Sequence, residues 1–400
     1  MKTLLKIAWR NVWRNKLRSS LVILSIVLGI WAGLFLMAMT LGLNEQRMNG
    51  AVETYLSHLQ IHNPKFKEDQ NIKYFIEDKD VVIKYLKENK DVKAFAERII
   101  VTGMVANASG SKGIQIQGIH PEKEKKLTKI SQKLVDGTYF TKFKKNPVII
   151  GKKLANKLKL KIRSKIVVTF QDYKGNLASA LFRVEGIYKT NNSIFDESTL
   201  FVRASDLEKS IGLQGEIHEI AILGNSIADI SKIKKDLTPK IKPSKIETWK
   251  EISPELGYAQ EMMSSMIFVF MGIVLIALAF SIINTMLMAV LERKKELGML
   301  MAVGMNKKRL FAMIAIETVF IAMIATPIGM LLSFWSISYF NKYGIDLSAV
   351  AAGLENLGIG SRIYTYLPIN LYFSITAMTI LVAFLSAIFP ARRALKTSIT

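Results

Sequence analysis

The sequence contains no cysteine and only four histidines among its 400 residues. It therefore has no disulfide framework, no thiolate nucleophile and no zinc or iron–sulfur site ligated by cysteine. Long polar tracts are also missing, and 50% of the residues are hydrophobic. This composition excludes an intrinsically disordered chain.

The motifs of common enzymes are missing as well. No G-x-x-x-x-G-K-[ST] run occurs, since Gly151 and Lys152 lack the preceding glycine, and there is no G-x-S-x-G or H-E-x-x-H sequence. His58 and His62 lie four residues apart and could share a helical face as metal ligands. Residues 59–61 between them instead resemble a strand, so we expect no metal site. The sequence predicts a protein that is not an enzyme and carries no cofactor.

Four long apolar runs are present. A bilayer core of about 30 Å requires roughly 20 apolar residues in a helix, and each run reaches that length. The first run is too long for the apolar region of a signal peptide, which holds about 7 to 15 residues, so we expect it to remain as a membrane anchor. The predicted transmembrane helices are residues 19–44, 262–291, 310–341 and 367–390.

The charges beside these runs predict an orientation. Residues 1–18, expected to form an amphipathic helix, carry six basic residues and no acid, and the connector 292–309 carries six basic residues and two acids. The loop 342–366, by comparison, carries two basic residues and two acids. Because short cytoplasmic loops are rich in lysine and arginine, both termini, including the tail 391–400, are predicted to be cytoplasmic in the inner membrane. Segment 45–261 is then periplasmic, and much of the net charge of +23 is a topology signal that does not predict nucleic-acid binding.

The periplasmic segment 45–261 has a mixed α/β pattern. Turn sequences at residues 109–110 and 174–176 predict hairpins. Since strand and helix patterns interleave irregularly, we expect a mixed-sheet domain with a second lobe. The boundary between the two is expected within about residues 120–145. Strands are predicted at 98–106, 113–119, 147–150, 165–170, 180–188, 200–203 and 219–223, and helices at 80–89, 152–158 and 227–237.

One acid, Glu317, interrupts the third apolar run. A carboxylate inside a bilayer is costly unless it is paired or near the interface. It could be a contact in a helix seam or a proton-coupling site. The alternative is a shallow acid that reaches the cytoplasmic headgroups or pairs with Lys307, Lys308 or Arg309. We favour this alternative because a proton pathway needs more than one ionisable group.

The apolar runs otherwise offer few polar groups, so a hydrophilic permeation path is not expected. Methionines gather near their ends, and these soft, unbranched side chains adapt to acyl chains. Such methionines are more often simply lipid-facing. The candidates for contact with a lipid-like cargo are Met37, Met39, Met263 and Met266.

The connector between the second and third runs is predicted to form a short helix. Glu292 and Glu296 fall on one face, Leu297 and Leu300 fall on another, and Gly304 provides a helix stop. An exposed apolar stripe on so short a helix needs a docking partner. The alternative is an amphipathic hairpin lying against anionic headgroups.

Three motifs point to one family. Residues 8–18 are similar to an A-W-R-N-L-x-R-N-K-x-R opening helix, residues 389–394 to a Y-P-A-R-R-A ending, and the connector to an E-R-x-x-E-x-G-x-x-x-A-x-G segment. This arrangement resembles the FtsX/MacB/LolC–LolE permeases, four-span subunits of ABC transporters. The resemblance implies that an ATPase subunit docks on Glu292, Arg293, Glu296, Leu297, Gly298, Ala302 and Gly304.

Residues 113–122, 134–140 and 148–155 resemble the periplasmic domain of the same family, and fit its lipoprotein-releasing LolC/LolE branch best. The resemblance implies two copies of a separate ATPase subunit, which use ATP and Mg²⁺, and a second permease protomer, identical or homologous. It also implies lipoprotein cargo, a periplasmic carrier and contact with membrane lipid. Two other functions stay open, namely MacB-like export of a periplasmic substrate and FtsX-like regulation of an extracellular hydrolase.

Overall fold

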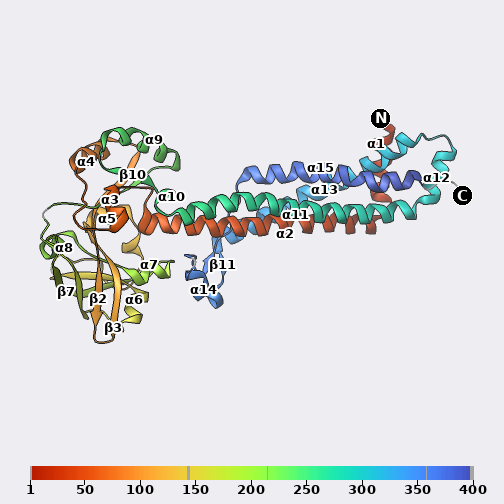
Figure 1. Ribbon diagram of the computed structural model, residues 1–400. Coiled ribbons are helices and arrows are strands. Elements are labelled where there is room, and N and C mark those ends of the chain that lie inside the picture. The colour runs from red at the N-terminus through yellow and green to blue at the C-terminus, as the bar shows by residue number, and fades with distance from the viewer. Residues whose placement is uncertain (1, 142–144, 214, 357, 397–400) are drawn as a thin grey trace. The chain divides into compact units, whose positions relative to one another are not determined.

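The computed structural model describes residues 2–141, 145–213, 215–356 and 358–396 (Figure 1). The fold divides into two compact units. Residues 1–45, 260–346 and 362–400 make up the helical unit, and residues 46–259 and 347–361 make up the α/β unit. An α/β unit inserted after the first long apolar helix is the architecture that the sequence predicts.

The helical unit contains four helices that are long and apolar enough to cross a membrane. At roughly 1.5 Å per residue each exceeds the thickness of a bilayer core. They are α2 (Lys16–Ala51), α11 (Pro254–Glu292), α13 (Lys307–Tyr343) and α15 (Ile369–Lys396). The first three contain a predicted span, and α15 begins two residues after the predicted start of the fourth. The shorter elements are α1 (Lys2–Arg14), α12 (Lys294–Ala302) and the strand pair β11 (Ile345–Asp346) and β12 (Arg362–Ile363).

Glycine brings the first two long helices close together. A Cβ atom on Gly29 would lie 2.7 Å from Leu278, and one on Gly33 would lie 2.8 Å from Val274. Because these distances are shorter than van der Waals contact, larger residues on this face of α2 would push α11 away. Small residues are the usual means by which membrane helices approach each other.

The α/β unit is built on a ten-stranded sheet with the order β10-β1-β9-β2-β3-β8-β5-β7-β4, and β6 pairs with β2 and β7. The strands are β1 (Leu59–His62), β2 (Val92–Asn107), β3 (Gly110–Ile119), β4 (Leu134–Gly137), β5 (Pro147–Gly151), β6 (Lys165–Gln171), β7 (Leu177–Tyr188), β8 (Thr199–Arg203), β9 (Glu219–Gly224) and β10 (Lys245–Thr248). Its helices are α3 (Pro64–Asp69), α4 (Lys79–Glu88), α5 (Pro121–Leu127), α6 (Lys152–Lys157), α7 (Ser193–Ser198), α8 (Ala204–Ile211), α9 (Ile227–Leu237), α10 (Trp249–Ile252) and α14 (Ala351–Asn356). A π-helical turn at Val52–Leu56 precedes β1.

The predicted strands and helices of this unit all coincide with observed elements, but the predicted division into lobes near residues 120–145 is wrong. Strands after this region return to pair with strands before it: β8 pairs with β3, and both β6 and β9 pair with β2. One sheet therefore runs through residues 46–259, and this part of the chain stays in one unit.

The two faces of the central strands differ in chemistry. One face carries Ile61, Ile99, Val101, Ile116 and Ile222, which pack into two apolar cores. The helices α4 and α9 cover one of these cores, and Figure 1 shows them together at one end of the unit. The opposite face carries polar side chains at alternating positions, namely Gln60 and His62 on β1, Glu219 on β9, Arg98 on β2, and Gln115 and Gln117 on β3.

Candidate coupling site and polar cavity

The connector forms the predicted short helix, α12, and Gly304 ends it. The Gly304 N–H donates to the Met301 carbonyl at 3.1 Å, and the Met305 N–H donates to the Leu300 carbonyl at 3.0 Å. This pair of hydrogen bonds is a Schellman motif, which needs a residue with positive φ after the helix. Gly304 has φ +99°, a conformation that glycine adopts without strain.

One side of α12 packs inward and the other is open. Leu297 is 4% exposed and belongs to the core of the helical unit. At Gly298, no heavy atom of the described residues lies within 4 Å of the position that a Cβ would occupy. Met299 and Val303 are large apolar residues that are 63% and 84% exposed. The outer surface of α12 is thus free to receive an apolar partner.

Ion pairs hold α12 to its neighbours. Arg14, the last residue of α1, donates to Glu296 Oε1 on α12 at 2.7 Å. Arg293, between α11 and α12, donates to Glu296 Oε2 at 3.3 Å and to Glu317 on α13 at 3.1 and 3.2 Å. The hydrogen bond from Arg14, together with that from Arg293, lowers the pKa of Glu296 below its ordinary value. The four side chains therefore link α1, α12 and α13.

Glu317 is thus a buried, paired carboxylate. Its side chain is 9% exposed and that of Arg293 is 13% exposed. The observed partner is Arg293, at the start of α12. The predicted partners Lys307, Lys308 and Arg309 instead follow the end of α12. The pairing supplies the counter-charge that a carboxylate at this depth needs.

The N-terminal helix α1 also packs on α13. Ala8 and Val12 are fully buried, and the Trp9 ring meets the Phe320 ring edge-on with 5.5 Å between centroids. Both α1 and α12 are therefore attached to the same long helix.

The four candidate cargo-facing methionines do not share one environment. Met37 is 4% exposed and lies within the core of the helical unit. Met39 and Met263 are half-buried, and Met266 is exposed. A cargo contact at Met37 would require the surrounding helices to separate.

His58 and His62 each contact a group within the α/β unit. His62 lies in strand β1, as predicted for this segment, and its Nε2 is 2.9 Å from Glu247 Oε2. His58 Nδ1 accepts a hydrogen bond from the Gly224 N–H at 3.1 Å. Burial lowers the pKa of both rings. In the described ranges, no group of three histidines and acids is placed to hold a metal ion.

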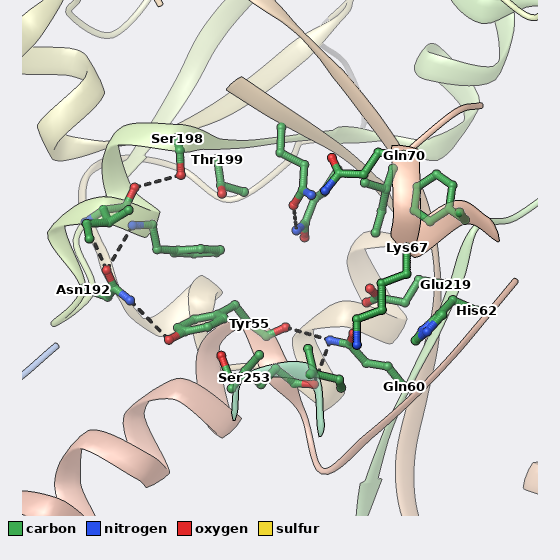
Figure 2. A pocket seen from close by; sticks show the side chains of 18 of the residues that line it. Tyr55, Gln60, His62, Lys67, Gln70, Asn192, Ser198, Thr199, Glu219 and Ser253 are labelled. Atoms are coloured by element: carbon green, nitrogen blue, oxygen red, sulfur yellow. Dashed lines mark hydrogen bonds between the residues drawn. The ribbon is translucent and has the colours of Figure 1, made fainter. Parts of the chain in front are cut away.

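A second feature, which the sequence analysis did not predict, is a cavity of about 530 Å³ in the α/β unit. Figure 2 shows Tyr55 and Asn192 on one side and Lys67, His62 and Glu219 on the other. The lining residues come from five strands and several helices, so they are scattered over some 200 positions. The Gln-x-Gln pattern at 115–117, polar residues alternating within an otherwise apolar strand, is the one signal that could have indicated it.

Comparison with known proteins gives two family matches that together cover most of the chain. The MacB-like periplasmic core domain family matches residues 19–240, and the FtsX-like permease C-terminal family matches residues 268–399. The first match alone extends over more than half of the chain.

Individual relatives are more distant. The lipoprotein-releasing system transmembrane protein LolC of Neisseria meningitidis is 22% identical over 336 residues, covering 79% of both chains. The ABC transporter permease YtrF of Bacillus subtilis is 30% identical over 132 residues, covering 33% of this chain and 30% of that one. The periplasmic region of MacB from Actinobacillus actinomycetemcomitans aligns with a TM-score of 0.36 at 14% identity, covering 53% of this chain and 97% of that structure.

Proposed function

Because the chain belongs to the FtsX/MacB family of ABC transporter permeases, we propose that it couples the motion of a separate ATPase subunit, through α12, to the release of lipoproteins from the inner membrane. Permeases of this family are multi-pass membrane subunits with no catalytic centre and no cofactor of their own. Hydrolysis of ATP therefore belongs to the ATPase partner.

The coupling role is supported chiefly by the surface of α12. Its inner side is held by Leu297 and by the ion pairs of Glu296, while Gly298, Met299 and Val303 stay accessible. A partner that binds the accessible side can therefore pull on a helix attached to α1 and α13. In this arrangement Glu296 is a positioning residue, and the open side makes the contact.

Two long helices supply a path for the motion. Both α2 (Lys16–Ala51) and α11 (Pro254–Glu292) extend past the predicted ends of their spans. A hydrogen-bonded helix transmits displacement along its axis. We propose that ATPase movement at α12 reaches the α/β unit along these helices.

Release of lipoproteins is supported by two features. The LolC relative, which aligns over 79% of this chain, is a lipoprotein-releasing transmembrane protein. The long helices also present few polar groups, as suits a cargo with acyl chains. We further propose two copies of the ATPase, a second permease protomer and a soluble carrier as partners, with both termini cytoplasmic and the α/β unit periplasmic.

Substitution of Gly298 by tryptophan tests the coupling role. The open space beside Gly298 lets the fold accept the indole, which then blocks docking, so Gly298→Trp abolishes co-purification of the ATPase while membrane insertion persists. Gly113→Trp is the matched control, since that glycine of β3 is equally open within the described chain. Unchanged co-purification of the ATPase with Gly298→Trp would refute the docking role.

The cargo is tested separately. The native complex, captured in detergent without added nucleotide, is expected to hold acylated protein that mass spectrometry detects. A complex that instead retains a hydrolase or a periplasmic adaptor, and no acylated protein, would contradict lipoprotein release and favour regulation or export.

A further inference from the structure

The cavity of the α/β unit lies on the polar face of the central sheet. Its volume of about 530 Å³ falls in the range of small-molecule sites, which is about 300 to 1,000 Å³. Three strands line it with Gln60, Gln115, Gln117 and Glu219. Tyr55 lines it from the π-helical turn, and Asn192 lines it from the start of α7. All of these residues belong to the α/β unit.

Gln117 provides the strongest indication of a ligand. It is 5% exposed, and its Nε2 donates to Gln115 Oε1 at 2.9 Å. Its Oε1 is buried and accepts no hydrogen bond from any described residue. An unsatisfied buried acceptor costs about 1–3 kcal/mol, and in native proteins most such acceptors are paired with protein groups or with ordered water. A donor supplied by a ligand would satisfy it.

The charged groups around the cavity already have partners. Lys67 Nζ lies 2.7 Å from Glu247 Oε2, and Glu219 Oε1 accepts from Arg98 at 2.7 Å. Glu255, in the first turn of α11, accepts from the Ser253 hydroxyl at 2.6 Å. Since these hydrogen bonds already occupy the charged groups, the carboxamides are left to bind a ligand, and carboxamides suit an uncharged one.

Carboxamides dominate the polar lining of the cavity. Those of Gln60, Gln70, Gln115 and Gln117 offer donors and acceptors side by side, the pattern that matches peptide groups. Among the aromatic rings of the lining, Tyr55 stacks on Phe195 and Phe66 stacks on His218, each with 4.8 Å between centroids.

We propose that this cavity binds a short, uncharged peptide segment, with Gln117 accepting a hydrogen bond from a backbone N–H of the ligand. The Tyr55 hydroxyl accepts from Asn192 Nδ2 at 3.2 Å, which leaves its own hydrogen free to donate to a ligand carbonyl. Burial raises the pKa of Tyr55, so the hydroxyl keeps that hydrogen at neutral pH.

The test uses the full chain in detergent micelles, without ATPase, and a pool of acetylated, amidated tripeptides of alanine, serine and phenylalanine. Calorimetry is expected to detect binding of the pool, and Gln117→Leu is expected to weaken it at least tenfold. The melting temperature of Gln117→Leu should stay the same or rise, because the substitution removes an unsatisfied buried acceptor. Gln132→Leu, the same change at an exposed glutamine outside the lining, should bind like the wild type.

Three results would overturn the proposal. They are absence of tripeptide binding to the wild-type chain, equal binding by Gln117→Leu, and binding of maltotriose in preference to the tripeptides. If Gln117→Leu fails to fold, Gln115→Leu, which alters the neighbouring half-buried carboxamide, is expected to give the same loss of binding, and unchanged binding would again overturn it. Because the ATPase is left out, these results are independent of the docking experiment at Gly298.

Discussion

Two arginines, Arg98 in the α/β unit and Arg293 in the helical unit, each bind two carboxylates, yet their surroundings differ. Arg98 donates to Glu124 from Nε at 3.2 Å and Nη2 at 2.7 Å, and to Glu219 from Nη1 at 2.7 Å; its side chain is 1% exposed. Arg293 binds Glu317 and Glu296, and the Glu296 side chain is 44% exposed.

The two clusters differ in how much of each is exposed to solvent. Arg98 joins β2, β9 and α5, elements already bound by one sheet, so its ion pairs hold a single geometry. Arg293 joins α12 to α13, and Glu296 continues the link to α1 through solvent-exposed groups. Exposed pairs break and reform at little energetic cost, which fits the proposal that α12 transmits motion.

The largest expected effect is at Arg98. Arg98→Ala leaves two buried carboxylates without their cation, and breaking a buried pair in this way costs about 3–5 kcal/mol. We expect a large fall in the melting temperature of the purified chain. Lys232→Ala, which removes an exposed pair with Asp91, is the control and should change the melting temperature little. Equal melting temperatures for the two variants would show that the Arg98 cluster is not what holds the sheet face together.

A smaller effect is expected at Glu317. Glu317→Gln weakens two hydrogen bonds from Arg293 to a charged acceptor, an effect of roughly 1–3 kcal/mol. Because the pair also positions α12, stimulation of the ATPase by the permease should fall together with the melting temperature. Glu88→Gln, at an exposed acid of α4, should leave both measurements unchanged. Full stimulation in a destabilised Glu317→Gln variant would separate this pair from coupling.

The Arg14–Glu296 pair should matter for coupling more than for stability. Its side chains are 53% and 44% exposed, so Arg14→Glu should cost less than about 1 kcal/mol of stability. It should nevertheless reduce stimulation of the ATPase, because α12 loses its link to α1. Arg14→Lys, which keeps the cation, should retain most of the stimulation. Equal loss of stimulation in Arg14→Lys and Arg14→Glu would exclude the charge of Arg14 as the cause.

The smallest effect concerns Glu197 of α7, a surface carboxylate that binds Lys157 at 2.6 Å and Lys112 at 2.9 Å. The hydrogen bond from Lys157, followed by that from Lys112, lowers the pKa of Glu197 to about 2. A folded pKa below the unfolded value means that the stabilisation is present above about pH 4.5 and is lost as the pH falls towards 2. Glu197→Gln should therefore lower the melting temperature slightly at pH 7 and leave it unchanged near pH 2. A difference that stays constant over this range would exclude the ion pairs as its cause.

The sequence predicted those features that depend on neighbouring residues. The apolar runs are visible as composition, and the turn at Gly304 follows from a glycine after a short helical pattern. Hairpins such as β2–β3 depend on a local turn and were predicted as well. The family motifs added the expectation that α12 binds an ATPase.

The features that the sequence missed depend on pairs far apart in the chain. Arg98 meets Glu219 across 121 positions, and Arg14 meets Glu296 across 282 positions, so no local pattern identifies either partner. The same holds for the cavity, where Gln117 acquires its buried, unpaired oxygen only because β2 and β8 lie on either side of β3. The division into lobes was wrong for this reason too, since strand order is set by long-range pairing.

The most direct test of the coupling role uses the absence of cysteine. Gly298→Cys introduces the only thiol of the chain, on the open side of α12. In membranes that contain the assembled complex, a short bifunctional maleimide–amine reagent should cross-link this thiol to the ATPase subunit, and ATP should change the yield. A thiol that is labelled only from the periplasmic side, or that never cross-links to the ATPase, would contradict the proposal that α12 receives the motion.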